Sequence, residues 1–103
     1  MAVIARFIYE VKPGRFDDFM AKLQEAAGRR FNSDVMPKSV RLFRKSVPGP
    51  DTAQIILHIE YNDMGAYGAR TAFETANTEW RKLFAATPDS PERLVSVELL
   101  TEL

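Results

Sequence analysis

The sequence predicts an α+β domain in which a four-stranded antiparallel sheet carries two helices on one face. Four strand-like runs and two segments with helical spacing follow one another in the order β-α-β-β-α-β. The first and third of these runs are apolar on one side and mixed on the other, whereas a half-solvated strand alternates cleanly between apolar and polar residues. Two helices can cover only one face of a small sheet. The predicted cover for the other face is a second copy of the chain.

The length and composition are typical of one globular domain that spans residues 1–103. The 14 basic and 14 acidic residues give zero net charge, which predicts neither a nucleic-acid nor a membrane partner. The absence of cysteine excludes disulfides and thiolate chemistry. No signal-peptide pattern opens the chain, and no apolar run reaches the roughly 18–20 residues of a membrane span. The expectation is therefore a cytoplasmic protein.

The first strand is predicted over residues 3–11. One of its sides is entirely apolar and carries Val3, Ala5, Phe7, Tyr9 and Val11. Its other side is mixed and carries Ile4, Arg6, Ile8 and Glu10. Pro13 and Gly14 then supply a turn.

The first helix follows this turn. Its apolar residues have helical spacing and are Phe16, Phe19, Met20, Leu23, Ala27 and Phe31. Asp17 and Asp18 lie in its first turn, where carboxylates favour the positive end of the helix dipole. Gly28 weakens its end.

The second and third strands, at residues 40–47 and 55–61, are predicted to form a hairpin around a turn at residues 48–51. The second strand is basic, which fits an exposed edge. Its phase is ambiguous, because Val40 and Leu42 compete with Phe43 and Val47 for the apolar side.

The second helix is predicted to begin after Asp63, a plausible N-cap, and to run over residues 64–86 with a possible break at 77–78. The last strand covers residues 94–100. With right-handed crossovers, this order gives a ferredoxin-like sandwich with strand order 4-1-3-2. The two strands that carry apolar residues on both sides then lie at its centre.

Short motifs add a resemblance. One of these motifs is the helix entry Val11-Lys12-Pro13-Gly14-Arg15-Phe16. The other is the stretch from His58 to Tyr61, followed by Arg70 and Glu79-Trp80. In these motifs the chain resembles the dimeric α+β barrel superfamily, including its NIPSNAP-type and antibiotic-biosynthesis-mono-oxygenase-like members. The resemblance implies two ferredoxin-like protomers packed sheet against sheet. The superfamily hosts cofactor-independent mono-oxygenases, isomerases and haem-degrading enzymes, so the fold leaves function open. The haem-degrading branch uses a histidine on the second helix, and residues 64–86 contain none.

The candidate catalytic residues are His58, Glu60 and Arg6. His58 is the only histidine, and histidine is the side chain that changes charge near neutral pH. By strand parity it shares a face with Glu60 and, across the central pair, with Arg6. A proton-abstraction mechanism would use His58 as base, Glu60 to orient it and Arg6 to hold a phenolate or enolate oxygen.

The candidate ligand-binding residues are Glu10, Ser96, Glu98 and Trp80. The first three are predicted on the face of His58, where two sheets would enclose a cavity for a small ring-containing metabolite. Trp80 continues the apolar stripe of the second helix, so core packing is its competing interpretation. The sequence shows no metal-ligand cluster and no phosphate loop, and no cofactor is expected.

The competing hypothesis is a non-catalytic homodimeric module. In it, the same charged residues form an ion-pair network that sets how two copies pair. RNA binding, which uses the same topology, is disfavoured because the outer side of the third strand (Ile56, His58, Glu60) lacks an aromatic residue.

Overall fold

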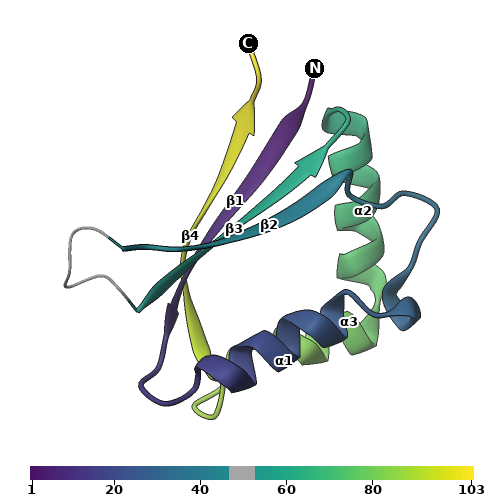
Figure 1. Ribbon diagram of the computed structural model, residues 1–103. Helices are drawn as coiled ribbons and strands as arrows, with labels where there is room; N and C mark the ends of the chain where they lie inside the picture. The colour runs from purple at the N-terminus through teal and green to yellow at the C-terminus, as the bar shows by residue number, and fades with distance from the viewer. Residues whose placement is uncertain (47–52) are drawn as a thin grey trace.

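The computed structural model of the protein describes residues 1–46 and 53–103, and its strands and helices follow the predicted order (Figure 1). The elements are β1 (Val3–Val11), α1 (Phe16–Ala26), the 3-10 turn η1 (Arg29–Phe31), β2 (Ser39–Arg44), β3 (Gln54–Tyr61), α2 (Met64–Ala76), α3 (Thr78–Leu83) and β4 (Glu92–Thr101). The predicted turn at residues 48–51 lies outside the described residues.

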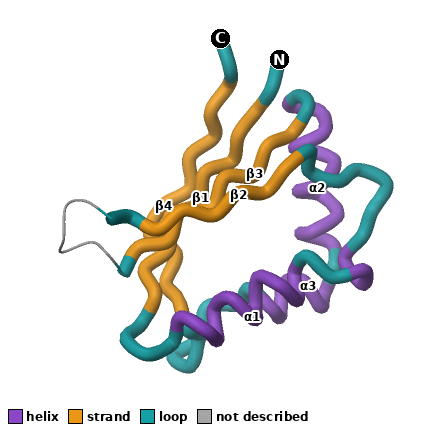
Figure 2. The backbone as a smooth tube through the Cα atoms, in the orientation of Figure 1, coloured by secondary structure: helices purple, strands orange, loops and turns teal. Residues whose placement is uncertain are grey.

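The four strands form one sheet in the order β2-β3-β1-β4, and each neighbouring pair is antiparallel. This confirms the predicted order 4-1-3-2 and the α+β class. The helices lie together on one side of the sheet (Figure 2). The chain ends meet at one end of the sheet, where the Glu102 amide donates to the Ala2 carbonyl at 2.9 Å.

The helical segments differ from the prediction in their boundaries. α1 ends at Ala26, and the 3-10 turn after Gly28 returns Phe31 to the core, where it is 1% exposed. The possible break in the second helix is confirmed, because Asn77 has an extended backbone and its side chain accepts from the Trp80 amide at 2.9 Å. Asp63 caps α2 as predicted, accepting from the Ala66 amide at 2.8 Å.

The core lies between the sheet and the helices. One cluster of buried hydrophobic residues in it consists of Tyr9, Val11, Phe19, Ile55 and Leu57. Four of these come from the sides of β1 and β3 that were predicted to be apolar, so that assignment is confirmed. Among the described residues, no helix is both long and apolar enough to cross a membrane.

Strand pairing also settles the phase of β2. Val40 pairs with Ile59 and Leu42 pairs with Leu57, so both point toward the helices, whereas Phe43 pairs with Ile56 on the other side. The side of the sheet away from the helices carries no further layer in the described structure (Figure 2). We call this side the open face.

Candidate functional site

Two rows of side chains cross the open face from β2 to β4, because residues paired across antiparallel strands share a side of the sheet. The charged row consists of Arg41, His58, Arg6 and Glu98. The apolar row lies next to it and consists of Phe43, Ile56, Ile8 and Ser96.

The two rows are in contact at the β2 end of the sheet. The Phe43 ring meets the His58 ring in an edge-on arrangement, with 5.0 Å between centroids. The Arg41 guanidinium lies over the same phenyl ring, 5.2 Å from its centroid. His58 therefore lies beside an aromatic wall and between two arginine positions, Arg41 and Arg6.

Arg6 is incompletely satisfied. Its Nε lies 3.5 Å from Glu98 Oε1, close enough for an ion pair. The same Nε is nevertheless buried and makes no hydrogen bond to any described residue, so the contact is electrostatic only. A buried donor without an acceptor is uncommon in folded proteins, and an acceptor from a ligand or a second copy would complete it.

The remaining acids of this face are paired with neighbours other than His58. Glu60 accepts from Ser39 Oγ at 3.4 Å and lies 3.4 Å from Lys38 Nζ. Glu10 lies 3.4 Å from Arg93 Nη2. The structure thus brings six of the predicted site residues to one face: Arg6, Glu10, His58, Glu60, Ser96 and Glu98. Their chemical roles stay predictions.

Trp80 does not join them. It lies on α3, on the helix side of the sheet, where its ring meets Phe31 edge-on at 5.1 Å and Phe84 at 4.9 Å. These contacts fit the competing interpretation of Trp80 as a packing residue. Trp80 and the charged row therefore lie on opposite sides of the sheet.

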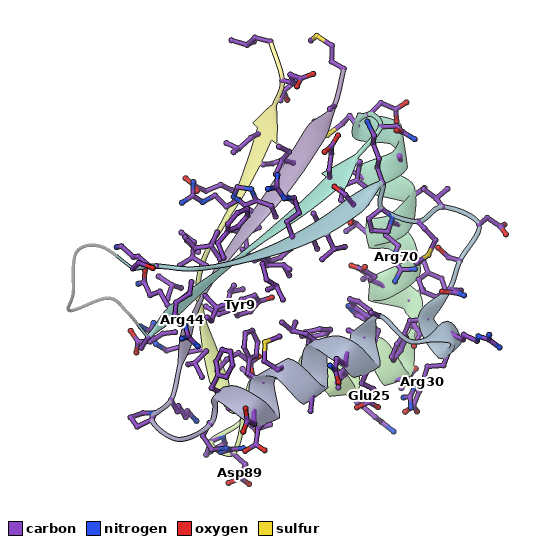
Figure 3. All side chains as sticks on the ribbon, viewed as in Figure 1. Tyr9, Glu25, Arg30, Arg44, Arg70 and Asp89 are labelled. Atoms are coloured by element: carbon purple, nitrogen blue, oxygen red, sulfur yellow. The ribbon has the colours of Figure 1, made fainter. Side chains whose placement is uncertain are left out.

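A polar cluster that the sequence did not indicate lies inside the helix side, around Arg70 of α2 (Figure 3). The Arg70 side chain donates to the Phe31 carbonyl at 2.6 Å, to Ser33 Oγ at 3.1 Å and to Glu74 Oε2 at 2.9 Å. The guanidinium also lies 5.3 Å from the Trp80 ring centroid. The only signal in the sequence is the spacing of Arg70 and Glu74, which places them on one helix face.

Burial shifts the ionisation of groups near this cluster. Desolvation raises the pKa of Glu74, and the hydrogen bond from Arg70 partly opposes the rise. Burial also raises the pKa values of Tyr9 and Tyr61 to about 12, with the Glu74 charge adding to both. Both phenols therefore stay neutral to a higher pH than an exposed tyrosine does.

Among the described residues, no group of three or more histidine, cysteine, aspartate or glutamate side chains comes close enough together to hold a metal ion. A groove of about 470 Å³ lies between α1 and the segment that leads into β4, and it is lined by side chains of both signs. Beside it, Lys22 Nζ and Glu92 Oε2 form a largely buried ion pair at 2.8 Å. The cations of this groove, Arg15, Lys22 and Lys82, are already paired with Asp18, Glu92 and Glu79.

Comparison with known proteins identifies the fold. No family model matches the chain, and no curated protein is detectably similar to it. Solved structures do match. An uncharacterized NIPSNAP-like domain protein from Burkholderia xenovorans is 20% identical with a TM-score of 0.68, over 99% of this chain and 85% of that one.

Two other solved structures match the same fold. A candidate antibiotic biosynthesis monooxygenase from Bordetella bronchiseptica is 21% identical with a TM-score of 0.64, over 99% of this chain and 97% of that one. A dimeric ferredoxin-like protein from an uncultured marine organism is 12% identical with a TM-score of 0.67, over 99% and 97%. The chain therefore has the ferredoxin-like fold, and its structural neighbours include the kinds of protein that the sequence resemblance named.

Proposed function

We propose that this chain forms a homodimer through its open face, and that the facing sheets enclose a site for a small, acidic, ring-containing metabolite. The observation that carries the proposal is the juxtaposition of the charged row and the apolar row on one uncovered face. An apolar wall with a few convergent polar groups is the usual composition of a small-molecule site. The ring would pack on Phe43, Ile56 and Ile8, beside the arginines of the charged row.

Exposed apolar surface supports the homodimer. On the open face the side chains of Phe43 and Leu100 are 38% and 42% exposed. Large apolar side chains exposed on one face of a small protein are typical of an interaction surface. One structural neighbour, the protein from the uncultured marine organism, is itself described as dimeric.

The chemistry that fits the charged row is proton abstraction without a cofactor. His58 would accept a proton from an acidic C–H or O–H group, and Arg6 and Arg41 would stabilise the phenolate or enolate that results. Reprotonation at another atom makes the reaction an isomerisation. Addition of the carbanion to dioxygen would give a hydroperoxide, and loss of water with cleavage of its O–O bond would leave a carbonyl at that carbon, so that the substrate itself supplies the electrons of a mono-oxygenation. Glu60 would orient the imidazole only after it releases Lys38 and Ser39.

A second candidate function, the non-catalytic dimeric module, is favoured by a different observation. The acids of the open face already pair within one chain: Glu98 with Arg6, Glu60 with Lys38 and Glu10 with Arg93. Such a network can set the register of association with little net gain in stability. In this second candidate function, the charged row takes no part in binding a ligand.

The variant His58→Ala separates the two candidates. Binding of 4-nitrophenolate, with uncharged 4-nitrotoluene as control probe, is followed by optical titration, and dimerisation by sedimentation velocity. The enzyme proposal expects at least about tenfold weaker binding of the phenolate in an intact dimer. A variant that loses the dimer but keeps its phenolate affinity would end that proposal in favour of the module. Met64→Ala, on an exposed residue of α2, is the matched control.

A further inference from the structure

We propose a second, separate small-molecule site on the helix side of the sheet, which takes a small aromatic carboxylate. It is a hollow of about 250 Å³ between the first turns of α1 and the strands β2 and β3. Its lining is apolar except for one cation and consists of Phe16, Met20, Leu42, Phe43, Arg44 and Ile55.

The fold builds this hollow from regular positions. Phe16 and Met20 are four residues apart on α1 and therefore lie on one helix face. Leu42 and Arg44 are two residues apart on β2 and share the helix side, and Ile55 is the strand partner of Arg44. Rigid elements thus hold the lining on two sides, which is what a site of fixed shape requires.

The hollow is not closed by the protein's own side chains. Phe16 and Leu42 are 38% and 40% exposed although both side chains line this hollow. Large apolar side chains that line a common depression and stay open to solvent are typical of a surface that another molecule covers.

Arg44 determines which kind of molecule fits. Its guanidinium lies over the Phe16 ring, 4.7 Å from the centroid, and both residues line the hollow. Among the described residues it has no carboxylate partner and no hydrogen bond, in contrast to Arg6, Arg70 and Arg93. A guanidinium held against an aromatic ring is positioned in advance, and its N–H groups match a carboxylate in bidentate fashion.

The volume sets the size of the ligand. A dry apolar cavity of about 150 Å³ is known to hold benzene. A hollow of about 250 Å³ therefore has room for one phenyl ring and a short arm that brings a carboxylate to Arg44. This site does not depend on the proposed function, because its cation and most of its lining point to the other side of the sheet from His58.

The test uses 3-phenylpropionate and its uncharged analogue 3-phenylpropan-1-ol, titrated into the labelled protein and followed by NMR chemical shifts. We expect the carboxylate to bind with a dissociation constant of about 1 mM or tighter, as its small size allows. The shifts should centre on Leu42 and Ile55. The alcohol should bind at least about tenfold more weakly.

Three variants make the test specific. Arg44→Met should weaken binding of the carboxylate at least about tenfold and leave the affinity for the alcohol unchanged. Arg81→Met, an exposed arginine of α3, is the matched control and should change neither. Leu42→Trp should fill the hollow and abolish binding of both probes, and the amide spectrum of each variant shows whether the fold is retained.

Equal affinity of the wild type and Arg44→Met for the carboxylate would overturn the proposal. Binding that is lost in Arg41→Met and retained in Arg44→Met, with shifts at Ile8 and Ile56, would do so as well. That result would instead locate the carboxylate on the open face and leave the proposed function intact.

Discussion

A guanidinium is unfavourable inside a small protein unless its N–H groups find acceptors, and Arg70 meets this condition at 2% exposure. Its acceptors come from separate parts of the chain: Glu74 on the same helix, the Phe31 carbonyl at the end of η1, and the Ser33 hydroxyl in the loop that leads to β2. The arginine thus ties the loop after η1 to α2. It is a structural residue in this arrangement.

Arg70→Met should lower the free energy of unfolding by about 3 kcal/mol or more, because it leaves Glu74 and the Phe31 carbonyl without their donor. Urea denaturation followed by circular dichroism measures the change. Glu74→Gln keeps a hydrogen-bond acceptor and is the matched control, with a smaller expected loss. A change below about 1 kcal/mol for Arg70→Met would contradict the structural role of this arginine.

Tyr9 and Tyr61 predict an alkaline limit to stability. Their pKa values are about 12 in the folded protein against 10.0 for an unperturbed phenol, mainly because of burial. The contribution of these two phenols to the free energy of unfolding is therefore complete below pH 10. It is lost as the pH rises from 10 towards 12, because the tyrosines of the unfolded chain ionise first. Unfolding free energies measured between pH 9 and pH 11.5 should fall more steeply for the wild type than for the double variant Tyr9→Phe, Tyr61→Phe. Equal slopes would refute this prediction.

The junction of α2 and α3 depends on one side chain. Asn77 has φ −88° and ψ 113°, and its amide oxygen accepts from the Trp80 amide, so it ends one helix and caps the next. Asn77→Ala should lower the free energy of unfolding by about 1 kcal/mol, the usual value of a helix N-cap. Thr75→Ala, an exposed position in α2, should stay within about 0.5 kcal/mol in the same urea titration. A helix that runs unbroken through the Asn77→Ala variant with no loss of stability would contradict it.

The sequence predicted β1 and β3 well because a period of two assigns every side chain to a face once one residue is placed. The same parity predicted that His58, Arg6 and Glu98 share a face, and the strand pairing places all three on the open face. Strand parity did not assign Arg41 to a face, because apolar residues occur on both sides of β2. Only the pairing with β3 decides that Arg41 lies beside His58.

Other features had no periodic signal. The first helix was predicted to continue towards Phe31, and a 3-10 turn after α1 presents Phe31 to the core instead. The partner that anchors Arg70 is a backbone carbonyl 39 residues away, and every residue has a carbonyl, so residue type could not point to it. Sequence patterns report which face a residue occupies, whereas contacts between a side chain and a distant backbone depend on the final packing.

At the scale of the whole molecule, the described residues leave β4 largely uncovered on both of its sides. Val97 and Leu99 pair with Phe7 and Ala5 on the helix side, yet they are 49% and 41% exposed, and Leu100 on the open face is 42% exposed. A chain of this length buries only about two-thirds of the surface that its unfolded form exposes. Association of the open face with a second copy would therefore remove from water the apolar surface around Leu100, which the described helices do not reach.

Ile56→Lys tests this association directly. Ile56 lies in the apolar row between Phe43 and Ile8, at the centre of the open face, so a lysine there would place an unpaired charge in the middle of the dimer. We expect the wild type to sediment as a dimer at micromolar concentration and the variant to dimerise at least about 100-fold more weakly. Met64→Lys, which replaces an apolar residue that is 50% exposed on α2, should leave the dimer unchanged. A wild-type protein that sediments as a monomer would refute the homodimer and, with it, any ligand chamber between two sheets.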